Sequence, residues 1–176
     1  MKGLIKGIGL GLFCVSSHGY AHTGAHMQAS FSGGFFHTLT GWDHVVAFAL
    51  IGLFVSVFTL RKASQLLSLI AMAMTAGYLV GLEWSAPTSV EIVVISSLFG
   101  FPIALWMLKQ GGLKSVVAMG GIVAFSLVHG LVQGGEAQGS AFLFGIGIVL
   151  ASAMIMVLSC VIGRVVMRLR LTQASV

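Results

Sequence analysis

Two histidines and an aspartate lie inside a stretch of this sequence that is otherwise strongly apolar. In FFHTLTGWDHVVAF, residues 35–48, His37 is followed by Asp43 and His44, and the next sixteen residues, 45–60, include no charged side chain. A carboxylate and two imidazoles with no ammonium group beside them are suited to binding a cation. Mixed nitrogen and oxygen ligands favour a borderline transition metal such as Ni²⁺, Co²⁺ or Zn²⁺.

The spacing of His37 and His44 leaves two arrangements open. On one regular helix the two residues share a face but lie ~10.5 Å apart along the axis, at 1.5 Å per residue. A single ion cannot easily bridge that distance. Gly41 lies between them and is the loosest point of the segment. Either the helix is interrupted there and the ligands converge, or two sites lie one above the other.

A second polar set occurs in HGLVQGGE, residues 129–136. His129, Gln133 and Glu136 are at positions i, i+4 and i+7, which share one face of a helix. Taken singly, each residue has an ordinary explanation, such as an interfacial hydrogen bond or a helix cap. Taken together, they predict a metal site or pathway. The candidate ligands are His37, Asp43, His44, His129, Glu136 and Glu91, with Gln133 as a weaker amide ligand.

The elements that position these residues are predicted by composition. Of 176 residues, 57% are hydrophobic and 7% charged, whereas a soluble domain carries roughly 25% charged residues. The chain is therefore an all-α integral membrane protein. It has about five apolar segments near the ~20 residues of a spanning helix, which form a single transmembrane domain, 22–176. The segments are 35–60, 65–82, 90–108, 115–131 and 140–163.

The N-terminus has the pattern of a cleaved signal peptide, residues 1–21. A basic start, a short apolar run and small residues before Ala21 support a cut after that residue, with an uncleaved anchor as the alternative. His22 would then begin the mature chain. Its amine and imidazole could chelate Ni²⁺ or Cu²⁺, with His26 as a third nitrogen. Because Cys14 would be removed, Cys160 would remain without a disulfide partner.

Charged residues are sorted by sign along the apolar segments. The seven basic residues outside the signal are Arg61, Lys62, Lys109, Lys114, Arg164, Arg168 and Arg170. If the mature N-terminus is periplasmic, all seven are cytoplasmic, as the positive-inside rule requires, and they do not indicate nucleic-acid binding. The four acids of the chain, Asp43, Glu83, Glu91 and Glu136, then fall on the other side. This predicts a multi-pass protein of the bacterial inner membrane with a cytoplasmic C-terminus.

The motifs resemble those of the HupE/UreJ family, hydrogenase and urease accessory proteins regarded as nickel or cobalt permeases. GGFFHTLTGWDHVVAFALIGL is similar to the family signature, approximately G-F-x-H-P-L-x-G-x-D-H. SVEIVVISSLFG resembles the family's third-span motif, and FSLVHGLVQGGE its fourth, usually F-x-H-G-x-A-H-G-x-E. The resemblance covers nearly the whole mature chain. Thr38 stands where the family usually has proline, which predicts a softer helix break, and Gln133 replaces the family's second histidine.

This resemblance implies uptake of Ni²⁺ or Co²⁺ from the periplasm through a pathway lined by His, Asp and Glu. By the match, His37, Asp43 and His44 are ligands or pathway residues, with Glu91, His129 and Glu136 as their partners. The ion is cargo and no prosthetic group is expected. Partners would be membrane lipid and hydrogenase or urease maturation proteins, and the sequence is compatible with an oligomer.

The sequence limits both the energy source for uptake and the kinds of protein that this chain could be. The chain has no G-x-x-x-x-G-K-[ST] phosphate loop, so membrane potential or proton exchange would drive uptake, and we expect no enzyme activity. Three alternatives remain open. They are a b-type cytochrome with His44 and His129 as axial ligands, an intramembrane metal-dependent hydrolase, and a metal-sensing accessory membrane protein.

Overall fold

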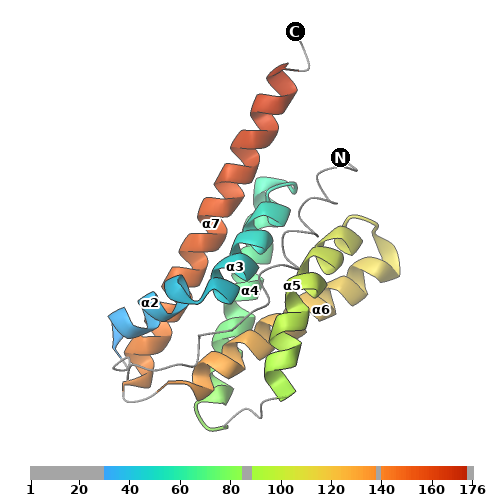
Figure 1. Ribbon diagram of the computed structural model, residues 1–176. Coiled ribbons are helices and arrows are strands. Elements are labelled where there is room, and N and C mark those ends of the chain that lie inside the picture. The colour runs from blue at the N-terminus through green and yellow to red at the C-terminus, as the bar shows by residue number, and fades with distance from the viewer. Residues whose placement is uncertain (1–29, 85–88, 138–139, 174–176) are drawn as a thin grey trace.

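The computed structural model describes residues 30–84, 89–137 and 140–173, and every ordered element within them is a helix (Figure 1). The helices are α2 (Phe31–Thr40), α3 (Trp42–Val55), α4 (Leu60–Gly81), α5 (Ser89–Leu108), α6 (Gly112–Gly135) and α7 (Ala141–Gln173). The predicted signal peptide, with its cleavage site, lies outside the described residues. The all-helical architecture predicted from composition is confirmed for the described part of the chain.

The first apolar segment is not one helix but two. Ser30 is the N-cap of α2, and its hydroxyl oxygen accepts a hydrogen bond from the N–H of Gly33. α2 and α3 meet at Gly41 and are bent by 78° relative to each other. The bend lies at the extended backbone of Gly41 (φ −70°, ψ 99°) and not at residue 38, where the family usually has proline. Thr38 is an ordinary helical residue whose hydroxyl donates to the Gly34 carbonyl.

Glycines bring α4 and α6 into close contact. A Cβ atom added at Gly77 or Gly81 would collide with a backbone carbonyl of α6, and one added at Gly130 or Gly134 would collide with a carbonyl of α4. Small residues at these positions let two helices approach closely within a membrane. This contact fixes the rotation of α6, which also packs against α5 and brings His129 beside Phe48 of α3.

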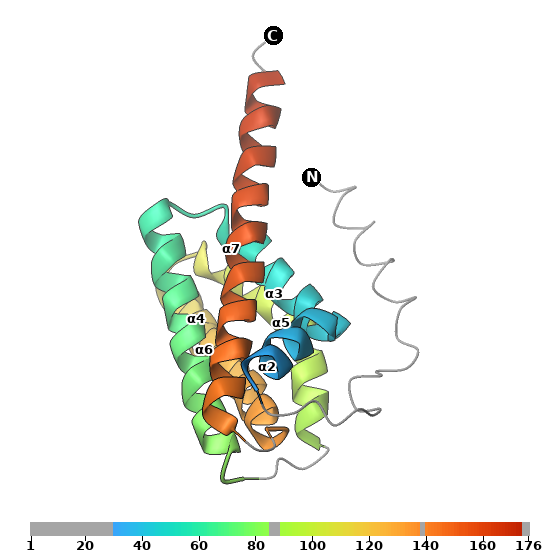
Figure 2. The same ribbon diagram turned by 90° about the vertical axis from the view of Figure 1, so that its left-hand side faces the viewer.

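α7 is the longest helix and runs along α2, α3 and one end of α4. Gly34 and Gly52 face its backbone carbonyls, and the hydroxyl of Tyr78 donates to the carbonyl of Ala141 at its start. Figures 1 and 2 show its C-terminal part extending beyond the other helices.

The predicted last span ended at residue 163, but α7 continues to Gln173. No glycine or proline follows Gly163, and arginine, leucine and methionine are good helix formers. Cationic side chains are also favourable near a helix C-terminus. Arg164, Arg168 and Arg170 therefore lie on the last turns of the helix rather than after it.

Within the described residues, three helices are long and apolar enough to cross a membrane, and the α2–α3 pair makes a fourth if it counts as one span. α5 contributes a shorter apolar stretch, Ile92–Leu108, and contains Pro102. A proline inside a helix removes one backbone hydrogen bond. The chain is thus a multi-pass membrane protein. Five spans were predicted, but within the described residues only three helices, or four spans with the bent pair, are long enough.

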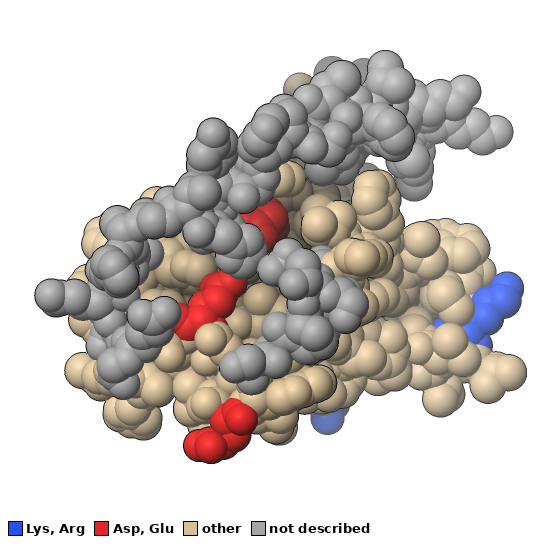
Figure 3. All heavy atoms as spheres, turned by 60° about the horizontal axis from the view of Figure 1, so that its bottom comes forward, with Lys and Arg blue, Asp and Glu red and all other residues tan. Residues whose placement is uncertain are grey.

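The apolar core lies where α3, α4, α5, α6 and α7 meet. Its most deeply buried side chains include Phe48, Ile51, Ile70, Leu105 and Ile122. Acidic residues gather at one end of this bundle. Figure 3 looks toward that end and shows acidic side chains on it, with basic side chains only at the margin of the view.

Candidate metal site

The bend at Gly41 brings His37 and His44 together. Their ring centroids lie 5.3 Å apart, so the first of the two open arrangements, an interrupted helix with converging side chains, is the one observed. A side chain at position 41 would interfere with this arrangement. A Cβ there would lie 2.8 Å from Cδ2 of His44 and 3.2 Å from Oδ1 of Asp43. Glycine is therefore required by the close approach of these two side chains.

His37 is paired with the end of α6. Its Nε2 lies 3.1 Å from Oε2 of Glu136, and the two side chains are 15% and 26% exposed. Glu136 is the C-cap of α6, and its backbone N–H donates to the carbonyl of Val132. The ring of Phe144, from α7, lies 5.9 Å from the His37 ring. Three elements distant in sequence thus surround one imidazole.

Asp43 and His44 lie beside His37 and Glu136, and we call these four residues the outer group. Oδ2 of Asp43 lies 3.6 Å from Nδ1 of His44. Asp43 is in the first turn of α3, where the helix dipole stabilises a negative charge. Its second oxygen, Oδ1, is buried and has no hydrogen-bond partner among the described residues. A carboxylate oxygen of this kind can accept a hydrogen bond or bind a cation.

His129 lies deeper in the bundle and is only 2% exposed. Its Nδ1 is 3.1 Å from the carbonyl oxygen of Phe125. Because a carbonyl can only accept, Nδ1 carries the proton, and in the neutral ring Nε2 keeps its lone pair. That is the tautomer in which Nε2 can bind a metal.

Gln133, one turn beyond His129 on α6, is completely buried. Neither its amide oxygen nor its amide nitrogen has a hydrogen-bond partner among the described residues. An unsatisfied buried polar group costs about 1–3 kcal/mol. A polar ligand, a water or an ion beside the amide would remove that penalty.

Phe48 packs against both His44 and His129. Its ring centroid lies 6.4 Å from the ring of His44 and 6.1 Å from that of His129, and the side chain is 1% exposed. Phe101 of α5 lies 5.9 Å from His129. Phe48 and Phe144 were not among the residues predicted from the sequence. The i, i+4 spacing from His44 could have indicated Phe48, but nothing local to the sequence indicated Phe144.

A family model describing the HupE / UreJ protein matches residues 10–175. This chain belongs to the HupE/UreJ family. No curated protein and no solved structure matches it significantly. HupE/UreJ proteins are known as nickel or cobalt accessory or permease proteins, and the family is one of transporters and accessory proteins, not of enzymes.

In this HupE/UreJ protein the predicted ligands fall into two groups. His37, Asp43, His44 and Glu136 form the outer group, and His129 and Gln133 are more deeply buried. In the part of the chain that the structure describes, no three His, Cys, Asp or Glu side chains are arranged as a metal-binding group. The other candidates, the side chain of Glu91 and the residues His22 and His26, lie outside the described atoms.

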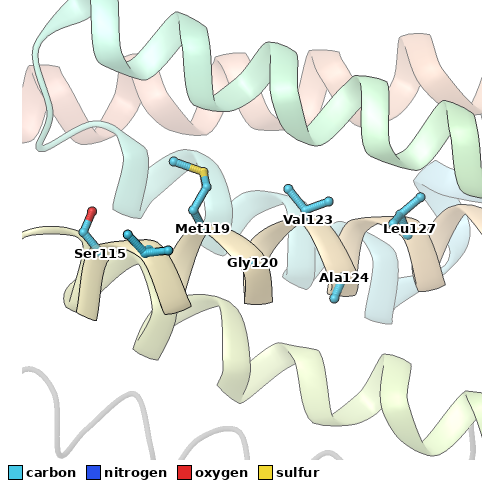
Figure 4. A pocket seen from close by; sticks show the side chains of 7 residues that line it. Ser115, Met119, Gly120, Val123, Ala124 and Leu127 are labelled. Atoms are coloured by element: carbon cyan, nitrogen blue, oxygen red, sulfur yellow. The ribbon is translucent and has the colours of Figure 1, made fainter. Parts of the chain in front are cut away.

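A shallow groove on the surface of α6 is separate from both groups of the HupE/UreJ site. Figure 4 shows it lined by side chains of α6, including Ser115, Met119, Val123 and Leu127. The lining is almost entirely apolar and includes none of the candidate ligands. The groove is therefore a feature of the apolar surface and not of the site.

Proposed function

We propose that this HupE/UreJ protein is a permease that takes up Ni²⁺ or Co²⁺ from the periplasm through the bacterial inner membrane. The observation that carries the proposal is the convergence of His37 and His44 at the Gly41 bend, with Asp43 beside one ring and Glu136 beside the other. Two imidazoles and two carboxylates supply the nitrogen and oxygen ligands that these ions accept.

The outer group is suited to capturing an ion and releasing it again. Nε2 of His37 now contacts Glu136. An ion bound there would exchange that contact for a metal–nitrogen bond, and the carboxylate would remain close enough to neutralise its charge. Transport requires binding that is favourable enough for an ion to enter but weak enough for it to leave. A ligand that already has an alternative partner meets that requirement.

Inward movement would lead past Phe48 to His129 and Gln133. Nε2 of His129 and the amide oxygen of Gln133 are the next ligands on the α6 face. The buried Phe48 ring packs beside both His44 and His129, so we infer that it narrows the way from one group to the other. In this proposal Phe48 keeps the pathway closed between transport events.

The membrane potential is a sufficient energy source. A divalent cation entering a cell at about −100 mV gains roughly 4.6 kcal/mol, twice the ~2.3 kcal/mol per charge. That free energy corresponds to about three decades of accumulation, at 1.4 kcal/mol for each factor of ten. Exchange with protons displaced from histidines would also be compatible with this site.

The test is uptake of radioactive Ni²⁺ by cells with and without the protein, with unlabelled Co²⁺ and Zn²⁺ as competitors. We expect protein-dependent uptake that Co²⁺ inhibits, and we expect accumulation above the external concentration to be lost when the membrane potential and the proton gradient are both collapsed. Purified protein in liposomes provides the stricter experiment. Binding of Ni²⁺ to the proteoliposomes without its appearance in the lumen would contradict transport and would support a metal-sensing accessory protein instead.

A further inference from the structure

Three cationic side chains, from α4, from α7 and from the residue that follows α5, converge on Phe58, in the short connection between α3 and α4. Nζ of Lys62 lies 5.3 Å from the centroid of the Phe58 ring, and Nζ of Lys109 lies 5.8 Å from it. The guanidinium of Arg164 donates a hydrogen bond of 2.8 Å to the backbone carbonyl of Phe58. We call Phe58, Lys62, Lys109 and Arg164 the Phe58 cluster.

Among the described residues, no acidic side chain balances this cluster. The acidic residues Asp43, Glu83, Glu91 and Glu136 occur near the opposite ends of their helices, at the start of α3 and α5 or the end of α4 and α6. Nε of Arg164 is buried and has no hydrogen-bond partner among the described residues. Its guanidinium is thus not satisfied by an ion pair in the described part of the protein.

Helix dipoles do not remove the excess positive charge. Lys62 is in the first turn of α4, where a cation is unfavourable, and no acidic residue is present in that turn. The C-termini of α3 and α5 each contribute a negative charge of about one half, whereas the N-terminus of α4 contributes about one half of the opposite sign. Against three full positive charges, a substantial net positive charge remains at the cluster.

Exposed apolar side chains lie close to the cluster residues in the sequence. Val57 and Leu60 flank the Phe58–Thr59 turn and are 42% and 73% exposed, and Trp106, one turn before Lys109, is 57% exposed. A free phosphate ion would use only the cationic groups. A phospholipid would use both features, because its phosphate would meet the cations and its acyl chains would cover the apolar side chains.

We propose that the Phe58 cluster binds the phosphate of an anionic phospholipid. By the distribution of basic residues this end of the bundle faces the cytoplasmic leaflet, where anionic lipids attract basic segments. The proposal differs from a general effect of positive charge near a membrane, because it assigns binding to three particular side chains. Lys62, Lys109 and Arg164 act together, whereas Arg61, Lys114 and Arg170 at the same end do not contribute.

The experiment measures thermal unfolding of the full-length protein in a non-ionic detergent, with and without added lipid. A ligand that binds the folded state raises the unfolding temperature. Phosphatidylglycerol is compared with phosphatidylcholine and with inorganic phosphate. The cluster variant is Lys62→Gln, Lys109→Gln and Arg164→Gln, and the matched control is Arg61→Gln, Lys114→Gln and Arg170→Gln, which removes the same number of charges from the same end.

We expect phosphatidylglycerol to raise the unfolding temperature of the wild type and of the control variant, and the increase to fall by about half or more in the cluster variant. Only the lipid-induced shift is compared, because losing the Arg164 hydrogen bond lowers the starting stability. If the triple variant does not fold, Lys62→Gln with Lys109→Gln replaces it, against Arg61→Gln with Lys114→Gln. Equal losses in cluster and control variants, or equal stabilisation by phosphatidylcholine or inorganic phosphate, would overturn the proposal.

Discussion

Nε2 of His37 lies 3.1 Å from Oε2 of Glu136, so a histidine of the first apolar segment is paired with the glutamate that ends α6. The contact connects the two motifs that the sequence could only place in order along the chain. Under the proposed function, a metal ion reaching His37 would meet a ligand and a counter-charge together. Metal uptake should therefore depend on this pairing and on the rings that surround it.

Removing any member of the outer group should reduce metal uptake. His37→Ala, His44→Ala, Asp43→Asn and Glu136→Gln each delete a ligand or a charge, and an interaction with a charged group is worth about 1.5–3 kcal/mol, or roughly tenfold or more. We expect at least that reduction in the initial rate of Ni²⁺ uptake at equal amounts of protein in the membrane. The matched control is Glu83→Gln, an exposed carboxylate outside the group. Near-normal uptake by all four variants would exclude the group from the pathway.

Gly41→Ala should impair uptake without changing any ligand. The added methyl would lie 2.8 Å from the His44 ring and 3.2 Å from the Asp43 carboxylate, so these side chains must shift. We expect a loss of uptake comparable with that of His44→Ala. Gly121→Ala is the control, since a Cβ there meets none of the described atoms within 4 Å. Equal uptake by the two variants would show that the close approach at Gly41 does not matter.

Gln133→His should add a ligand on the α6 face that carries His129. The position is completely buried and its amide lacks a partner among the described residues, so an imidazole nitrogen there could bind the ion. We expect uptake to saturate at a lower Ni²⁺ concentration and the maximal rate to fall, because release becomes harder. The control is Gln110→His, at an exposed glutamine beyond α5. An unchanged uptake curve for Gln133→His would mean that this face does not contact the ion.

Phe48→Leu should make the pathway leakier. The smaller side chain would leave space beside His44 and His129, the two rings that the phenyl ring now contacts. We expect faster uptake with weaker discrimination between Ni²⁺ and other divalent cations, measured by competition with Zn²⁺ and Mn²⁺. Leucine is chosen because Phe→Ala in a core costs about 3–5 kcal/mol. Phe99→Leu, at an exposed position on α5, is the control, and identical selectivity in both variants would exclude the proposed role of Phe48.

Reporter fusions should place the basic end of the molecule in the cytoplasm. A reporter that is active only in the cytoplasm should be active when it is joined after Val176. A reporter that is active only in the periplasm should be active when it is inserted in residues 132–139. The reason is that the seven basic residues of the apolar region share one end of the helices. Exchanged signals would reverse the orientation, and uptake from the periplasm would then begin at the wrong end.

Composition and the order of the motifs determine by themselves the class and the family of this protein. A chain with 7% charged residues must satisfy its backbone within helices in the bilayer, which predicts an all-helical membrane protein. The motifs around His37, Asp43 and His44 indicated the family, which the match over residues 10–175 confirms. These inferences succeed because they depend on the solvent surrounding the chain and on residues close together in sequence.

Tertiary structure alone decided which of these residues meet. Gly41 could be recognised as a weak point, but the 78° bend and the 5.3 Å between His37 and His44 depend on how α2 and α3 pack against α7. The pairing of His37 with Glu136 depends on glycine contacts that fix α6 against α4. Such distances are set by close packing between helices, and local hydropathy carries no information about the partner that each helix face will find.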